Sequence, residues 1–380
     1  MTAAGASASL VPSPVRIIGT GLIGGSLGLA LSGAGVDVQL EDVSPGTESL
    51  AIEMGAGHRP GPEDPDPALV LVAAPPDVAA ALVVRALSRW PTATVADVAS
   101  VKSIVLAGVR AVVDDGALAE DDLARYVGAH PMAGREVSGV IAARGDIFQA
   151  RPFVVVPHPT SRAASVAVVR ALALEIGSVP LVLDAADHDR SVAHVSHVPQ
   201  VVASLLGASL VDAPERSLEL AGPGLRDTSR IAASDPRLWV EILSANARAV
   251  GPILSELRDR LDGVLGALDS MTGDPDPRRG SRRAIAALIA DGNQGVQRIP
   301  GKHGGATDHF ATVTVLVPDR PGELGRLFTE MGEAGINLED LTLEHTFGKK
   351  VGMAHVSVTS GSEGLLTDAL TERGWSVAQG

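Results

Sequence analysis

The chain has 380 residues and a mass of 38.8 kDa, a length that suits two or three domains. It contains no cysteine, which excludes disulfides, thiolate metal ligands and a cysteine nucleophile, and which fits the reducing cytoplasm where we expect a soluble protein. The net charge of −14 and the 2% aromatic content argue against nucleic acid as a partner, because phosphate neutralisation needs cations and base stacking needs rings.

Residues 1–14 have neither the basic start nor the apolar stretch of a signal peptide, and we expect a disordered leader there. The uncharged stretch Ile17–Val36 is long enough for a membrane helix. It is rich in glycine, however, and each glycine costs about 1 kcal/mol in a helix interior. We therefore predict a strand, a glycine turn and a short helix instead of a membrane segment.

Residues 15–183 alternate short apolar runs with helical stretches such as Val78–Trp90 and Ser100–Val113. This alternation predicts an α/β domain of the Rossmann type, in which a doubly wound parallel sheet is built from repeated βα units. The predicted strands are Val15–Gly19, Val36–Glu41, Leu69–Ala73, Thr94–Asp97, Tyr126–Ala129, Phe153–Val156 and Val179–Leu183.

Residues 184–270 read as an all-α second domain for substrate binding and dimerisation. One apolar helix face is expected to bury itself in a subunit interface as well as in a core. Residues 271–308 are rich in Gly, Pro, Asp and Arg and are expected to be a linker with one short helix at Arg282–Ala290. The apolar face comprises Ile253, Leu254, Leu257, Leu261, Val264, Leu265 and Leu268.

Residues 309–380 predict a separate βαββαβ domain. A strand with alternating valines starts at Thr312, and a break at Pro321-Gly322 precedes an amphipathic helix. The remaining predicted elements are strands at Asn337–His345 and Val351–Thr359, a helix at Glu363–Arg373 and an edge strand at Trp375–Ala378.

A glycine loop follows the first predicted strand and opens the first helix, which is the context of a dinucleotide-binding fingerprint. Asp42 ends the second strand, where a carboxylate would bond the adenosine ribose hydroxyls; alternatively, it caps the next helix. No arginine follows Asp42 to accept a 2′-phosphate, so we expect NAD as the cofactor in preference to NADP. The residues expected to bind the cofactor are Gly19, Thr20, Gly21, Leu22, Ile23, Gly24, Asp42, Ala74 and Pro75.

Three further polar clusters are not needed by an α/β core. The first, Asp97–Lys102, follows a strand, although Ser100 could simply cap the next helix. The second, Gly128–Gly139, contains His130 at a strand end among glycines, where a side chain faces the crevice of a doubly wound sheet. The third starts at Gly222 in the helical region.

In this order, the clusters resemble the prephenate/arogenate dehydrogenases of tyrosine biosynthesis. The tail, with Asp319–Gly325 and Gly335–Asn337, resembles an ACT domain, the small-molecule sensing module of amino-acid enzymes. The motifs that carry the family resemblance are Gly21–Leu27, Asp97–Lys102, His130–Glu136, Ser196–Pro199, Arg226–Ala232 and Ser234–Trp239.

The resemblance implies NAD-dependent oxidative decarboxylation of prephenate to 4-hydroxyphenylpyruvate, without a metal. His130 would be the catalytic base, and Ser100 would bond the substrate hydroxyl or orient the imidazole. Arg230 would hold a substrate carboxylate through its bidentate fork. Further residues implied at the substrate are His197, Glu136, His188, Asp227 and Trp239.

Two departures from the family pattern leave points open. A three-glycine run is Gly222-Pro-Gly224 here, which puts a backbone contact in doubt. A second histidine after the Ser-His-x-Pro motif is replaced by Gln200, so L-arogenate remains an alternative substrate.

Other functions fit less well. A β-hydroxyacid dehydrogenase would need a catalytic lysine in the helical domain, but Ala185–Leu268 contains none. A non-catalytic NAD or amino-acid sensor would not need the catalytic set, and a metal site at His188, His194 and His197 lacks a suitable carboxylate.

The resemblance further suggests a homodimer through the helical domain. For the ACT unit we favour a regulatory site for L-tyrosine over a purely dimerising role. Its expected residues are Asp319, Gly322, Leu324 and Asn337.

Overall fold

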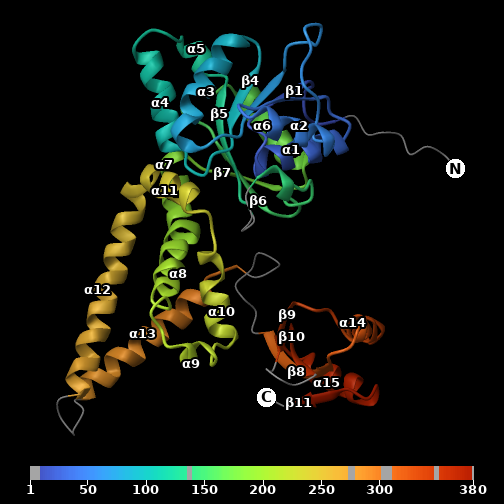
Figure 1. Cartoon of the computed structure of the whole chain (residues 1–380), viewed down its shortest axis with the longest axis vertical. Coiled ribbons are helices and arrows are strands. Elements are labelled where there is room, and N and C mark those ends of the chain that lie inside the picture. The colour runs from blue at the N-terminus through green and yellow to red at the C-terminus, as the bar shows by residue number, and fades with distance from the viewer. Residues whose placement is uncertain (1–8, 135–138, 273–278, 301–309, 346–350, 379–380) are drawn as a thin grey trace, which may run out of the picture. The chain divides into compact units, whose positions relative to one another are not determined.

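The computed structural model describes residues 9–134, 139–272, 279–300, 310–345 and 351–378 (Figure 1). The chain forms two compact units, Met1–Leu257 and Arg258–Gly380, each of which is described by itself. No helix in the described ranges is long and apolar enough to cross a membrane.

The first unit is built on a seven-stranded sheet with the order β2-β1-β3-β4-β5-β6-β7, which confirms the predicted Rossmann-type fold. The sheet is not entirely parallel, because β6 runs antiparallel to β5 while all other neighbours are parallel. The strands are β1 (Val15–Ile18), β2 (Val38–Glu41), β3 (Leu69–Val72), β4 (Thr94–Asp97), β5 (Tyr126–Pro131), β6 (Pro152–Val156) and β7 (Val179–Val182).

Helices cover both faces of this sheet. The apolar sides of α1, α2 and α6 pack in one core cluster, and those of α3 and α4 pack in a second. Strands β1, β3 and β4 are buried along their whole length, and β3 is accordingly apolar throughout. The charged residues Arg16 of β1 and Asp97 of β4 form buried hydrogen bonds. The helices are α1 (Leu22–Gly33), α2 (Pro45–Glu53), α3 (Pro76–Arg89), α4 (Ser103–Asp114), α5 (Glu120–Leu123) and α6 (Ala163–Glu175).

The expectation of a disordered leader was wrong for residues 9–14. Val11 is buried in the core of the first unit. The backbone N–H of Leu10 and the hydroxyl of Ser9 both donate to Oε2 of Glu175, at 2.6 and 3.2 Å. One apolar side chain and two hydrogen bonds therefore tie this segment to the end of α6.

The second part of the first unit is helical, as predicted. Helix α7 continues through a π-helical turn, η2 (Ala193–His197), directly into α8. A small core joins Ala193 and Val198 to Val250 of α12. The helices are α7 (Ala185–Val192), α8 (Val198–Ala208), α9 (Glu215–Leu218), α10 (Pro223–Ser229), the 3-10 turn η3 (Arg230–Ala232), α11 (Pro236–Ala245) and α12 (Ala247–Thr272).

Part of the predicted apolar face of α12 is open to solvent. Leu257, Leu261, Leu265 and Leu268 are between 39% and 56% exposed. A row of exposed leucines on one side of a helix is unusual for a surface that meets only water. It indicates a surface that binds another protein segment.

The second unit contains a helix where we expected mostly linker. Helix α13 (Arg279–Gln297) is longer than the predicted Arg282–Ala290, because the alanine-rich and apolar segment extends at helical spacing despite its glycines. The Gly- and Pro-rich segments 273–278 and 301–309 lie outside the described residues.

The remaining elements form the predicted βαββαβ arrangement around an antiparallel sheet with the order β11-β8-β10-β9. The alternating valines Val313, Val315 and Val317 face the core under both helices, as their spacing predicted. The elements are β8 (Phe310–Pro318), α14 (Glu323–Glu333), β9 (Asp340–His345), β10 (Val351–Thr359), α15 (Glu363–Glu372) and β11 (Ser376–Ala378).

Candidate active site

The glycine loop between β1 and α1 has the backbone that its sequence predicts. Gly19 has a φ of 96°, and a Cβ there would lie 2.3 Å from the carbonyl oxygen of Ala73. A Cβ on Gly24 would lie 1.9 Å from the carbonyl oxygen of Gly19, so only glycine lets α1 pack this closely. Gly21, by contrast, has open space around it and precedes α1 without a capping side chain. The N–H groups at the start of α1 are therefore available to a pyrophosphate.

Asp42 follows β2 and holds this loop. Its Oδ2 accepts hydrogen bonds from the backbone N–H of Thr20 at 2.6 Å and from the Thr20 hydroxyl at 2.8 Å. The alternative role as a helix cap was wrong, because Ser44 caps α2 by accepting from the N–H of Thr47. A carboxylate has about four acceptor positions, so Asp42 keeps capacity for ribose hydroxyls.

The other expected cofactor residues surround the same loop. Leu22 and Ile23 begin α1, and Ala74 and Pro75 follow β3. The backbone nitrogen of Ala74 is 3.6 Å from the position that a Cβ of Gly19 would occupy. These residues fit a dinucleotide at the carboxyl ends of β1 and β3, the region where doubly wound sheets bind their ligands.

A buried polar network lies at the ends of β4 and β5. The Lys102 ammonium bonds Asp97 Oδ1 and donates to the carbonyl oxygen of Ala129, while the Tyr126 hydroxyl donates to Asp97 Oδ2 at 2.6 Å. Asp97 and Lys102 are 0% and 1% exposed, so this is a structural ion pair and its cation is fixed behind the site. Burial lowers the pKa of Lys102, and the Asp97 charge opposes that shift.

Ser100 does not cap α4, which removes the structural alternative for this residue. The helix starts at Ser103, and the N–H groups of Lys102 and Ser103 donate to the two carboxylate oxygens of Asp189, at 2.8 and 2.9 Å. Ser100 lies partly buried in the segment between β4 and α4. Its expected hydrogen bond to His130 is not among those that the described residues form, since His130 bonds His188 instead.

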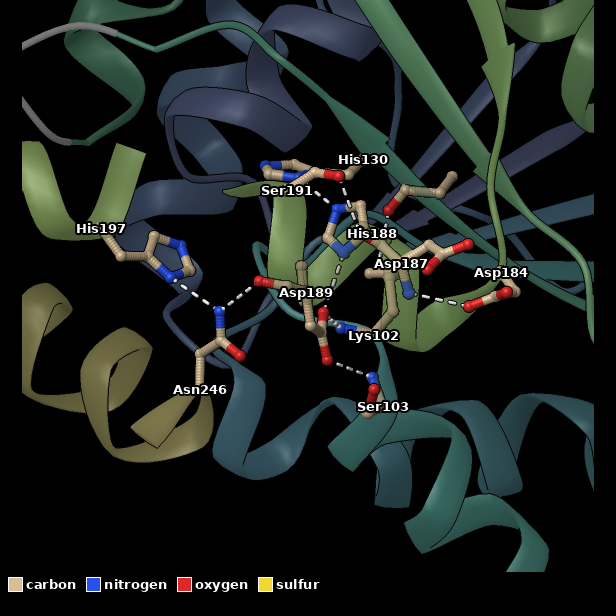
Figure 2. Close-up of polar contacts among 12 residues, drawn as sticks. Lys102, Ser103, His130, Asp184, Asp187, His188, Asp189, Ser191, His197 and Asn246 are labelled. Atoms are coloured by element: carbon tan, nitrogen blue, oxygen red, sulfur yellow. Dashed lines mark hydrogen bonds and ion pairs between the residues drawn. The ribbon is translucent and has the colours of Figure 1, made fainter. Parts of the chain in front are cut away.

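His130 is the first member of a hydrogen-bonded chain of three side chains (Figure 2). It lies near the end of β5, and its Nδ1 is 2.9 Å from Nε2 of His188. The Nδ1 of His188 is in turn 2.8 Å from Oδ1 of Asp189. His188, which the resemblance implies at the substrate, is completely buried. It lies behind His130.

Charge and burial shift the pKa values at the two ends of this chain. Burial, the neighbouring His188, and the Lys102 and His197 groups lower the pKa of His130 well below its usual value, against the Asp189 charge. His130 is therefore neutral at pH 7. Burial would raise the pKa of Asp189, but hydrogen bonds from His188, Ser103 and Lys102 outweigh it and lower the pKa to about 2.

His197 occupies the π-helical turn beside this chain. Its Nδ1 is 3.0 Å from Nδ2 of Asn246, and its ring meets the Trp239 ring edge-on with centroids 6.0 Å apart. Burial lowers the pKa of His197 to about 4; the Asp189 charge opposes this shift and His188 adds to it. The sequence analysis missed Asn246. This polar residue directly follows α11 and is buried, and only its position at the helix end is visible in the sequence.

The third cluster is exposed and is not part of the hydrogen-bonded chain of His130. Asp227 lies in α10 and Arg230 in η3, and both side chains face solvent. The departure Gly222-Pro223 has a simple reason, since proline suits the first turn of α10. Glu136 lies outside the described residues.

Gln200 is buried on α8, close to the segment that follows Arg230. Its Nε2 donates to the Ser204 hydroxyl at 3.3 Å, and its Oε1 accepts from the Ser234 hydroxyl at 3.5 Å. The residue that replaces the family's histidine thus links α8 to the loop before α11.

Three of the four expected effector residues line one cavity of about 280 Å³ in the second unit. Asp319, Gly322 and Leu324 contribute to its wall, together with residues of β9 and β10. Asn337 does not line it; its Nδ2 donates to Oε1 of Glu339 at 2.9 Å.

Comparison with known families accounts for most of the chain. Residues 27–182 match the family described as "Prephenate dehydrogenase, nucleotide-binding domain" and residues 184–274 match "Prephenate dehydrogenase, dimerization domain". Residues 311–373 match "ACT domain".

Individual relatives agree with these matches. The chain is 35% identical to the probable prephenate dehydrogenase NovF of Streptomyces niveus, over 94% of this chain and 98% of the relative. It is 30% identical to the cyclohexadienyl dehydrogenase of Zymomonas mobilis, over 73% of this chain and 96% of the relative. The fold is shared with a solved structure, the prephenate dehydrogenase from A. aeolicus in complex with hydroxyphenyl propionate and NAD+. The TM-score is 0.62 and the identity 24%, over 74% of this chain and 96% of that chain.

The sheet, the glycine loop and the helical second part define a dinucleotide-dependent dehydrogenase. The chain belongs to the prephenate dehydrogenase family and carries an ACT domain. It is an enzyme, and its first part is the nucleotide-binding domain of that family.

Proposed function

We propose that the protein catalyses the NAD-dependent oxidative decarboxylation of prephenate to 4-hydroxyphenylpyruvate. The observation that carries this proposal is His130, an imidazole kept neutral at a strand end of the sheet whose carboxyl ends hold the dinucleotide loop. A neutral imidazole can take a proton from a ring hydroxyl, which oxidation of that alcohol requires.

The roles of the chain's own groups follow from their positions. Gly19, Gly21, Gly24 and Asp42 would hold NAD, whose nicotinamide accepts hydride when bound. His130 removes the hydroxyl proton, a contribution of about 10²–10⁴-fold in rate. Loss of the ring carboxylate as CO₂ then leaves an aromatic ring, which makes the step effectively irreversible.

Substrate binding is assigned to groups around His130. Arg230 would hold a carboxylate through its bidentate fork, which a lysine could not reproduce. Ser100 would bond the hydroxyl that is oxidised. His197 and Trp239, which contact each other, would form one wall, and Asp227 would also bind the substrate; the implied role of Glu136 falls on a residue outside the described ranges.

L-arogenate is the second candidate substrate. It differs from prephenate by an amino group in place of the side-chain keto oxygen. Gln200 motivates this alternative, because a buried amide that bonds the loop after Arg230 can tune contacts on that side of the site.

We also propose a homodimer through the helical part and feedback by L-tyrosine through the ACT domain. The exposed leucines of α12 support the dimer, since they form an apolar face on a segment that matches a dimerisation domain. The cavity lined by Asp319, Gly322 and Leu324 supports an effector of amino-acid size.

The decisive experiment follows NADH formation with prephenate and with L-arogenate, each with NAD and with NADP. We expect turnover of prephenate with NAD, loss of turnover in His130→Asn with NAD binding retained, and inhibition by added L-tyrosine. Arg230→Ala should mainly raise KM. Undiminished turnover in His130→Asn would contradict the assignment, and an enzyme without activity on either substrate would favour a sensor.

A further inference from the structure

We propose that His188 and Asp189 are positioning residues that fix the tautomer of His130, leaving its Nε2 as the unprotonated nitrogen that accepts the substrate proton. The proposal rests on the proposed role of His130 as the base. It concerns two residues that do not need to touch the substrate.

The direction of each hydrogen bond follows from the end of the chain. An ionised carboxylate can only accept, so the contact of 2.8 Å requires that His188 Nδ1 carries the hydrogen. With one N–H on its ring, His188 has a bare Nε2. His130 Nδ1, at 2.9 Å from that nitrogen, must donate to it. Because a neutral imidazole has one N–H, Nε2 of His130 is left without a proton.

Asp189 is suited to set this direction because its own position is fixed. Both of its carboxylate oxygens accept backbone N–H groups at the start of α4, from Lys102 and Ser103. Its backbone carbonyl accepts from Asn246. The pKa of about 2 keeps the carboxylate ionised throughout the working range.

The same arrangement stabilises the protonated base. When His130 takes the hydroxyl proton at Nε2, it retains the hydrogen on Nδ1 and becomes an imidazolium ion. The negative charge of Asp189 reaches it through His188, while the Lys102 cation behind the site is already paired with Asp97. The positive charge that the His130 ring gains is therefore offset by the remaining anion, the carboxylate of Asp189.

The tautomer can be measured without any reaction. In protein labelled with ¹⁵N-histidine, the ring nitrogen shifts distinguish an Nδ1–H from an Nε2–H imidazole, and the His130→Asn variant identifies the His130 signals. We expect the Nδ1–H form in the unaltered protein and a shift to the Nε2–H form, which free histidine favours, in His188→Leu. His194→Leu, at an exposed position in the next helical turn, is the matched control and should leave the His130 signals unchanged. An Nε2–H form of His130 in the unaltered protein would overturn the proposal.

A kinetic test separates positioning from simple structural support. His188→Gly should lower kcat by about 10²–10⁴-fold with KM changed by less than about threefold. Added imidazole should restore part of kcat by occupying the emptied space, and His188→Gln should keep more activity than His188→Leu because its amide oxygen can accept from His130. Absence of both effects in variants that still bind NAD would contradict the positioning role. If the unaltered enzyme turns over neither substrate, the proposed function fails, while the ¹⁵N measurement still decides the tautomer.

Discussion

The side-chain amide of Asn246 donates a hydrogen bond to Nδ1 of His197, over 3.0 Å. The second amide hydrogen goes to the backbone carbonyl oxygen of Asp189 at 2.8 Å. Because Nδ1 of His197 accepts, its Nε2 carries the ring hydrogen and is a donor. The buried amide of Asn246 therefore determines which ring nitrogen of His197 is the hydrogen-bond donor. It also holds the Asp189 backbone in place.

Replacement of Asn246 tests this bracing. Asn246→Leu should lower the free energy of unfolding of the first unit by about 1–3 kcal/mol, because it removes the hydrogen bonds to the Asp189 carbonyl and to the buried Nδ1 of His197. Urea titration measures the change. Asn293→Leu, at an exposed position on α13, is the control and should stay within about 0.5 kcal/mol. Equal stability of the two variants would mean that the amide contributes nothing.

The pH dependence of stability should report His197. Its pKa is about 4 in the folded chain and close to 6.5 when unfolded, so the unfolded chain binds more protons between these values. Stability should therefore fall as pH is lowered from 6.5 to 4, by roughly 3 kcal/mol for this group. Asp189, at about 2 in the folded chain, adds a further loss below pH 3.8.

His197→Gln should reduce the fall in stability between pH 6.5 and 4, because glutamine does not titrate, while His130, whose pKa burial also lowers, still contributes. The measurement is the free energy of unfolding from urea titrations at several pH values. His194→Gln, an exposed neighbour in the same π-helical turn, should leave the slope unchanged. An identical slope in His197→Gln would show that other groups cause the acid sensitivity.

The glycine loop offers a matched pair of substitutions. Gly24→Ala should destabilise the first unit by about 1–3 kcal/mol, since its Cβ would lie 1.9 Å from the Gly19 carbonyl oxygen. Gly21→Ala should fold normally but weaken NAD binding, because the added methyl group enters the open space in front of α1. Thermal unfolding and NAD titration measure the two effects. Gly33→Ala, at the open end of the same helix, should change neither.

Asp42 should control the choice between the two nicotinamide dinucleotides. Asp42→Asn removes the charge that repels a 2′-phosphate and weakens the bond to the ribose hydroxyls. We expect the ratio of kcat/KM for NAD to that for NADP to fall about tenfold, equivalent to about 1.4 kcal/mol. Asp37→Asn, at the other end of β2, is the control. An unchanged ratio would assign the preference to another residue.

Features that depend on neighbouring residues could be predicted from the sequence. Strand β3 is a run of neighbouring apolar residues, and Gly24 has to be glycine because a Cβ there would meet the carbonyl oxygen of nearby Gly19. The same is true of the alternating valines of β8. In each case the physical cause lies within about one helical turn of the residue concerned.

The parts that escaped prediction depend on contacts between distant segments. The hydrogen bond between His130 and His188 joins residues 58 positions apart, and the bond between Asn246 and His197 joins residues 49 positions apart. Nothing next to Asp189 in the sequence shows that its partners start a helix in another part of the chain. Likewise, the burial of Val11 depends on a core that the whole sheet creates.

The π-helical turn at Ala193–His197 changes the angle about the helix axis between His188 and His197. His188 and His197 are nine residues apart, which in a regular α-helix places them on about opposite sides. The wider turn takes up residues without the usual rotation and so brings the two rings toward a common side, where Asn246 joins the Asp189 backbone to His197. Deletion of a single residue such as Val195 would place the two histidines eight residues apart, about 80° in a regular α-helix, and so would keep both rings on one side while shortening the helix. The angle between His188 and His197 is thus set by how this helix is wound as well as by how many residues it contains.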